Sequence, residues 1–290
     1  MSINRYFEEY VNWYSINWSS SGIIEEKIMF GYEAFVDKHG VLTIAVKIIF
    51  SCLQVSVTSI EHANEFAQKH FLRSSERWNG QEKRSWHDLM HQNKETLLQA
   101  FRSLGMIDAV LPRQNMYTYI LVMGTLKNNA EQCFDFLAEL KRKGLSFEKI
   151  ILLSGKRLLE DFEKTGLPVD VVTEAEMMLY LCSRHGGFKD DEIVLVDAPM
   201  IHYEDGTVTR PTTDSTLAYF AQTACVDGSC LVISENPHII RQTKVAQRIL
   251  DQTRFPVDGA GKAIEEPIDM IQLFDEFARA LYEEYKMQKK

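Results

Sequence analysis

The sequence Tyr117-Thr118-Tyr119-Ile120-Leu121-Val122-Met123 is an apolar, β-branched run near the middle of a 290-residue chain. Gly124-Thr125 follows it at once, and a helical pattern begins near Asn128. A buried strand, a glycine turn and an amphipathic helix in this order are typical of a parallel α/β unit. We therefore expect residues 117–123 to form a strand of a parallel sheet.

Three further apolar runs repeat this pattern, at residues 149–153, 193–196 and 231–233, and a last short strand is expected near residues 254–257. Ligands bind beyond the carboxyl ends of the strands in open α/β sheets, so the polar residues after each run should converge there. The sequence predicts a Rossmann-like, three-layer α/β fold. The segments after the three runs are Ser154-Gly155-Lys156, Asp197-Ala198-Pro199 and Ser234-Glu235-Asn236-Pro237-His238.

Residues 1–115 lack this alternation of strands and helices. They contain a clear amphipathic helix around Leu97 and Phe101, which Gly105 ends, and a proline-marked connection at Pro112 leads into the first strand. We expect a mostly helical N-terminal region over residues 1–115 and an α/β domain over residues 116–290. All four tryptophans fall in the first of these: Trp13, Trp18, Trp78 and Trp86.

The composition limits the partners and the compartment. The formal net charge is −9, and no block of Lys and Arg alternates with aromatic residues, which argues against nucleic acid as the main partner. The five cysteines are odd in number and show no C-x-x-C spacing, as in a reducing compartment, so a cytoplasmic location is expected. Residues 41–60 are nearly long enough for a membrane span, but the central Lys47 favours a buried segment instead.

Five short motifs, in this order, resemble the YdcF/SanA/ElyC-like family. The resemblance covers residues 117–250 and implies a Rossmann-like fold that binds S-adenosylmethionine or a nucleotide, with no particular reaction implied. The first turn has one glycine where the family has two or three, and Lys156 replaces a glycine in the second motif. The motifs are Met123-Gly124-Thr125, Ser154-Gly155, Thr173-Glu174-Ala175-Glu176, Arg210-Pro211-Thr212-Thr213-Asp214-Ser215, and Ser234 through His238 with Arg241.

One histidine and two arginines are the strongest candidates for chemistry. His238 stands at a helix start beyond a strand end, where the helix dipole favours a neutral imidazole that can act as acid or base. Arg210 and Arg241 are natural partners for a phosphate or carboxylate. The other predicted ligand-binding residues are Gly124, Thr125, Ser154, Gly155, Lys156, Glu174, Thr212, Asp214 and Ser234.

Several of these residues also have a structural interpretation. Glu176 has the spacing that caps its own helix, Glu174 suits the first turn of that helix, and Thr212 or Asp214 could cap the next one. A less favoured hypothesis places Mg²⁺ among the carboxylates of Asp197, Glu174, Asp214 and Glu235.

Two functions remain open. In the first, the strand-end crevice binds a nucleotide-like or other anionic small molecule, S-adenosylmethionine among them, and any reaction is a transfer or hydrolysis with His238 as acid or base. In the second, the chain is a non-catalytic interaction protein whose helical N-terminal region engages a partner protein. A degenerate glycine pattern favours the second, whereas His238, Arg241, Arg210 and Glu174 together favour the first.

Overall fold

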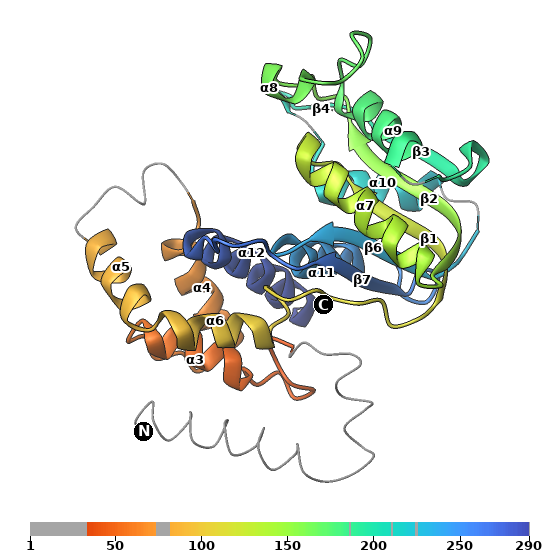
Figure 1. The fold of residues 1–290 in the computed structure, drawn as a ribbon. Helices are drawn as coiled ribbons and strands as arrows, with labels where there is room; N and C mark the ends of the chain where they lie inside the picture. Colours follow the sequence, from red (N-terminus) through yellow and green to blue (C-terminus); the bar gives the residue numbers. More distant parts are fainter. Residues whose placement is uncertain (1–33, 74–81, 186, 210, 224–225, 290) are drawn as a thin grey trace. The chain divides into compact units, whose positions relative to one another are not determined.

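The computed structural model describes residues 34–73, 82–185, 187–209, 211–223 and 226–289 (Figure 1). The chain divides into two compact units. Residues 1–110 together with residues 264–290 form unit 1, and residues 111–263 form unit 2.

Unit 2 is built on a five-stranded sheet in which every neighbouring pair of strands is parallel. The order β3-β2-β1-β6-β7 places β1 in the centre, so the chain moves outward to β3 and then returns to the other side of β1. This reversal puts a topological switch point between β1 and β6. The strands are β1 (Met116–Met123), β2 (Ser146–Gly155), β3 (Ile193–Ala198), β6 (Cys230–Glu235) and β7 (Val257–Lys262).

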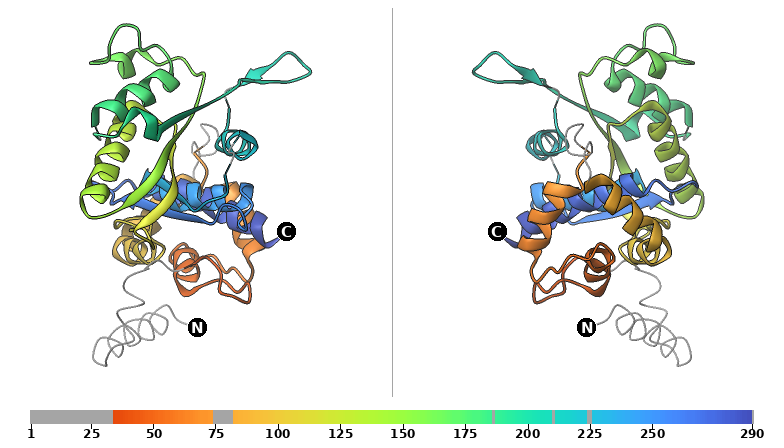
Figure 2. Two further views of the ribbon diagram at one scale, coloured as in Figure 1. Left: turned by 90° about the vertical axis from the view of Figure 1, so that its right-hand side faces the viewer. Right: turned by 90° about the vertical axis from the view of Figure 1, so that its left-hand side faces the viewer.

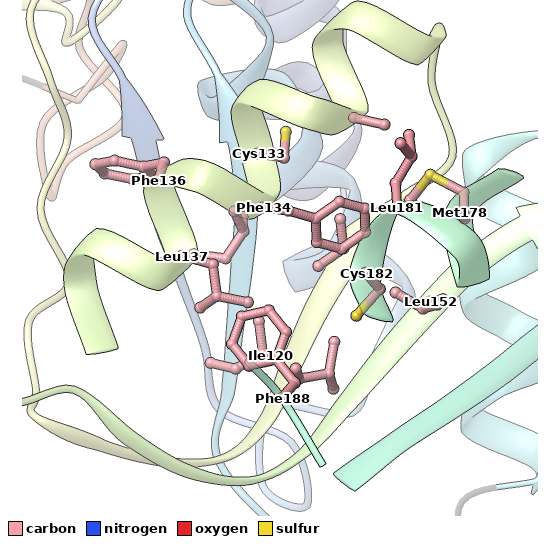
Figure 3. Packing of buried hydrophobic residues seen from close by; sticks show 14 of the residues in the cluster. Ile120, Cys133, Phe134, Phe136, Leu137, Leu152, Met178, Leu181, Cys182 and Phe188 are labelled. Carbon is pink, nitrogen blue, oxygen red and sulfur yellow. The ribbon is translucent and has the colours of Figure 1, made fainter. Parts of the chain in front are cut away.

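Helices cover both faces of this sheet. On one face α7 (Lys127–Arg142) and α9 (Glu174–His185) pack against alternate strand residues such as Ile120 and Leu152 (Figure 3). On the other face lie α10 (Thr213–Thr223) and α11 (His238–Ile249), as the contact of Gly259 in β7 with Thr243 in α11 indicates. The predicted three-layer α/β fold is confirmed.

Three smaller features complete unit 2: a short helix, a hairpin and a single helical turn. A short helix, α8 (Asp161–Lys164), follows β2, and the antiparallel pair β4 (Ile201–His202) and β5 (Val208–Thr209) follows β3. This hairpin stands away from the parallel sheet in both views of Figure 2. The single-turn η1 (Asp190–Glu192) leads into β3.

In unit 1 the described residues form helices around an aromatic core. Phe71 and Phe101 lie 4.9 and 5.2 Å, centroid to centroid, from Phe274, and Phe277 packs beside them. The prediction of a mostly helical N-terminal region is confirmed for the described residues. The helices are α3 (Ile44–Cys52), α4 (Ile60–His70), α5 (Glu82–Gln92), α6 (Lys94–Ser103) and α12 (Met270–Gln288).

The predicted α/β domain extended over residues 116–290. The structure divides the chain differently, because α12 belongs to unit 1. This helix buries Leu273, Phe274, Phe277 and Leu281 completely, and two of these rings are part of the aromatic core above. The amphipathic stripe of α12 was visible in the sequence, but a stripe does not say which core it covers.

The hydrophobic segment 41–60 contains the nine-residue helix α3 and then an irregular connection to α4. In the parts of the chain that the structure describes, no helix has the length and apolar character needed to cross a bilayer.

Candidate functional site

The predicted site residues lie at the carboxyl edge of the sheet, but on two different faces. Side chains alternate along a strand. Ser154 therefore points to the same face as Leu152, toward α7 and α9, whereas Ser234 follows the core residue Ile233 and points to the face of α10 and α11. The sheet therefore separates Ser154 from Ser234, although the sequence predicted both as ligand-binding residues of one site.

The turn after β1 is covered by a carboxylate of the chain itself. The N–H of Gly124 donates to the carbonyl of Leu153 at 2.6 Å. A Cβ on Gly124 would lie 2.9 Å from Oε2 of Glu174, which also accepts from the N–H of Gly155 at 3.2 Å. The close approach that this glycine permits is therefore used by Glu174, at the position where a dinucleotide fold usually holds its pyrophosphate.

Glu174 is part of a buried network with Arg157 and Glu163. Arg157 donates two hydrogen bonds to Glu163, from Nη1 to Oε2 at 2.6 Å and from Nη2 to Oε1 at 2.9 Å. Its Nη2 also lies 3.3 Å from Oε1 of Glu174. The exposed fractions of these side chains are 15% for Arg157, 0% for Glu163 and 13% for Glu174.

Within this network, the carboxylate of Glu163 lies at the start of α7. Hydrogen bonds from Arg157, followed by those from the backbone N–H groups of Glu160 and Lys127, lower the pKa of Glu163 below its ordinary value. Lys127 is the first residue of α7, where a helix presents unpaired N–H groups that attract anions. An internal carboxylate thus occupies the anion position at this helix start.

Lys156 and Ser154 lie near the end of β3. The Nζ of Lys156 is 3.6 Å from Oδ2 of Asp197, and its side chain is 61% exposed. Ser154 and Asp197 are partners in the register of β2 and β3, so their side chains share a face. The Oγ of Ser154 and the Oδ1 of Asp197 are buried, and neither has a hydrogen-bond partner among the described residues. A water or a ligand hydroxyl between them would satisfy both atoms.

A second polar cluster lies at the switch point, at the end of β6. Oε1 of Glu235 accepts from Nδ2 of Asn129 at 2.8 Å, and its Oε2 accepts from Sγ of Cys133 at 3.2 Å. Burial raises the pKa of Glu235, and the nearby His238 partly opposes this rise. His238 begins α11, Arg241 follows one turn later, and both are half-buried.

Burial also raises the pKa of the Cys133 thiol well above its ordinary value, and the Glu235 carboxylate adds to this effect. A thiol in this state is a hydrogen-bond donor and a poor nucleophile. Glu235 was considered in the sequence only as a metal ligand. Its hydrogen bonds to α7 could not be read from the sequence because they join residues more than 100 positions apart.

The loop before α10 has mainly structural contacts. Thr212 caps the helix through a hydrogen bond from the N–H of Ser215 to its Oγ1 at 3.2 Å, and Asp214 pairs with Arg248 of α11. Pro211 packs so closely on Gly155 that a Cβ there would lie 2.4 Å from its Cγ. Arg210 lies outside the described residues.

Two further predicted residues, Thr125 and Ser234, lie at the ends of β1 and β6. Thr125 is half-buried between β1 and α7, and Ser234 is buried at the end of β6.

The four carboxylates of the magnesium hypothesis do not meet. Glu174 pairs with Arg157, Asp214 with Arg248 and Asp197 with Lys156, while Glu235 accepts hydrogen bonds from α7. No group of three or more His, Cys, Asp or Glu side chains suited to a metal occurs among the described residues.

A cavity of about 410 Å³ lies elsewhere, on the outer side of α7. Its wall includes the pair formed by His185 and Asp135, whose Nδ1 and Oδ1 are 2.9 Å apart. None of the predicted site residues lines it, and its wall consists of Gln132, Asp135, Phe136, Ala138, Glu139, Arg142, His185 and Lys262.

The strand ends therefore include a turn after β1 that internal carboxylates fill, and a cluster of Glu235 and His238 at the switch point, with Arg241 one turn further along α11. The resemblance to the YdcF/SanA/ElyC-like family stays a prediction from the motifs. Comparison of the chain with family models, curated proteins and solved structures gives no match.

Proposed function

We propose that the chain binds an anionic, nucleotide-like small molecule at the carboxyl ends of β1 and β6. The observation that supports this proposal is the position of Glu235, a buried carboxyl group held by α7 next to His238 at the switch point. Such points are where open α/β sheets bind ligands. S-adenosylmethionine is one candidate, in keeping with the motif resemblance.

The two ends of such a ligand would meet different residues. A carboxylate offers about four acceptor positions, so Glu235 can still accept from a ribose hydroxyl after binding Asn129 and Cys133. The phosphate or carboxylate of the ligand would lie at the start of α11, near His238 and Arg241, where helix N–H groups and a guanidinium attract an anion. The turn after β1 is the less suitable anion position, because Glu174 and Glu163 already occupy it.

If the protein is an enzyme, this cluster suits a transfer or hydrolysis with proton transfer. A carboxyl group of raised pKa beside an imidazole can divide the roles of acid and base, as general acid–base catalysis requires. His238 would exchange the proton with the ligand, and Arg241 would stabilise the charge that develops.

Calorimetric titration with S-adenosylmethionine, ATP and AMP tests the proposal. One charge-assisted hydrogen bond contributes roughly 1.5–3 kcal/mol, so Arg241→Ala should weaken binding about ten- to a hundredfold. His238→Ala should act in the same direction. Arg254→Ala is the matched control, because Arg254 pairs with Asp227 near the opposite end of β7. Equal affinities of wild type, Arg241→Ala and His238→Ala would contradict the assignment.

A non-catalytic interaction protein remains the second candidate. The observation that favours it is the carboxylate over Gly124, because it fills the place where Rossmann-like enzymes bind phosphate. The helical N-terminal region would then engage the partner. Within it, Trp86 stacks on His70 at 5.5 Å and on Phe66 at 5.4 Å, while Trp13, Trp18 and Trp78 lie outside the described residues. The titration distinguishes the two, since an interaction protein binds none of the three metabolites.

A further inference from the structure

The two edges of the parallel sheet differ in how they are protected. At the β7 edge, the first five residues of the strand are buried. Side chains also bond to its backbone: the carbonyl of Val257 accepts from Gln247, the N–H of Val257 donates to Gln252, and the N–H of Gly259 donates to Asp258. These side chains occupy backbone groups at the start of β7 that a further strand would need.

The β3 edge has no such protection. Val194 is 40% exposed and Leu195 is 37% exposed, and as consecutive residues they lie on opposite faces of the sheet. Among the described residues, no side chain hydrogen-bonds to the backbone of β3. Natural edge strands usually carry charges, prolines or bulges that prevent pairing, but residues 193–196 are all apolar.

The hairpin that follows β3 is also exposed to solvent. It projects from the sheet (Figure 2), and its Tyr203 and Val208 are 53% and 49% exposed. An isolated two-stranded hairpin is at best marginally stable in water. The open edge and the unsupported hairpin are consecutive in the chain, so one partner could cover both.

We propose that β3 pairs with β3 of a second copy of this chain, antiparallel and about a two-fold axis, and so joins the two five-stranded sheets. A two-fold contact uses the same patch on both copies, so the β3 edge and the hairpin of each copy are covered by the other. In the antiparallel arrangement the hairpin beyond the carboxyl end of one β3 extends over the amino end of the other.

The charges at the two ends of β3 fit an antiparallel contact between identical chains. Asp197, the one charged residue of β3, stands near its carboxyl end, so a parallel pair in register would place two aspartates side by side. Asp190 and Asp191 are exposed before the amino end and form no ion pair with a described residue, whereas the exposed Lys156 lies beside the carboxyl end. Antiparallel pairing brings Lys156 of one copy toward these aspartates of the other.

The solution mass of the full-length chain tests this proposal, measured by light scattering after gel filtration. We expect twice the chain mass of 33.5 kDa for wild type. Leu195→Lys should give a monomer, because two lysines would meet at the centre of the contact. Val169→Lys, at a side chain that is 97% exposed in the loop after α8, is the matched control and should remain dimeric. Circular dichroism and melting temperature establish that both variants are folded.

A charge reversal tests the orientation. Lys156→Glu should shift the population toward monomer, and the combination of Lys156→Glu with Asp190→Lys and Asp191→Lys should restore the dimer. A wild type that is monomeric at every concentration, or a dimer that persists in folded Leu195→Lys, would overturn the proposal. Should Leu195→Lys fail to fold, Val194→Lys gives the same test from the other face of the sheet.

Discussion

Arg157 lies between the buried Glu163 and the half-buried Glu174, and pairs with both carboxylates. Its removal leaves Glu163, which has no exposed surface, as a buried charge without its main partner. Breaking a buried pair in this way typically costs roughly 3–5 kcal/mol. We expect Arg157→Met to lower the free energy of unfolding by about this amount, as measured by urea denaturation at neutral pH.

The triple variant Arg157→Met, Glu163→Gln and Glu174→Gln is the control, because it removes the charges together. Its free energy of unfolding should be much closer to that of wild type than the value for Arg157→Met. A single variant as stable as wild type would show that the three groups are solvated and not buried as a network.

The network should also depend on pH with a definite sign. Since the pKa of Glu163 is lowered in the folded chain, its stabilising contribution is complete above the ordinary glutamate pKa of about 4.3 and disappears as the pH falls through the folded-state value. Glu163→Gln should therefore be much less stable than wild type at pH 7, with the difference narrowing below about pH 4. A constant difference would contradict this linkage.

Glu235 should behave in the opposite way. Burial raises its pKa, so the folded chain binds this proton more tightly than the unfolded chain does, and stability falls as the pH rises from about 4.3 through the folded-state pKa. Glu235→Gln lacks this loss and keeps a hydrogen-bond acceptor for Asn129. Urea denaturation over a pH series should show that the free energy of unfolding of the variant rises relative to that of wild type as the pH rises.

Local residue roles were predictable from spacing, and distant ones were not. The capping of α9 by Thr173 and Glu176 is confirmed by three hydrogen bonds, because capping needs only residues three or four positions apart. Glu174, in contrast, accepts a hydrogen bond from Arg157, which lies seventeen residues away in the sequence. The sequence therefore predicted Glu174 as a ligand-binding residue, while the structure places it in an internal ion pair.

At the scale of the elements, the contact between β7 and α11 depends on a glycine. A Cβ on Gly259 would lie 2.1 Å from Oγ1 of Thr243, so one of the two elements would have to move. Overpacking of this kind costs roughly 1–3 kcal/mol. We expect Gly259→Ala to lower the melting temperature, and Gly259→Ala with Thr243→Ala to recover much of it, because the second change removes the Oγ1 and Cγ2 atoms that the new Cβ would meet. A double variant that melts at the same temperature as Gly259→Ala would contradict the clash with Thr243 and indicate strain in the backbone of β7.

This contact also explains why the last strand was misplaced. A short strand was predicted near residues 254–257, whereas β7 extends over Val257–Lys262. Its sequence, Val-Asp-Gly-Ala-Gly-Lys, has little β propensity, because Gly259 and Gly261 are needed for the close approach of Thr243 and Ile239. The four apolar, β-branched strands were predicted well for the converse reason: side-chain packing alone identifies them.

At the scale of the whole molecule, the described residues of unit 1 come from two separate parts of the sequence, before residue 111 and after residue 263. The N–H of Ile264 donates to the carbonyl of Ile107 at 2.8 Å, and α12 then supplies Phe274 and Phe277 to the core of that unit. A chain that stops after residue 263 should therefore lose the unit 1 core while the sheet keeps its own core.

Trp86 makes this prediction measurable, because its ring packs against Phe66 and Phe71 in unit 1. In the truncated chain, tryptophan emission should shift toward that of unfolded protein while circular dichroism still shows a cooperative transition from the α/β unit. Loss of both signals would mean that unit 2 requires unit 1 to fold.

The carboxylate over Gly124 has a consequence for how the folded protein responds to its surroundings. A turn that holds a free phosphate is stabilised by mass action, by about 2.7 kcal/mol when the ligand is at a hundredfold excess over its Kd. Here the anion is Glu174 or Glu163, joined to the turn by its own loop, so its local concentration never changes. The first βα turn should hold its shape equally well in a phosphate-starved and a phosphate-rich cell.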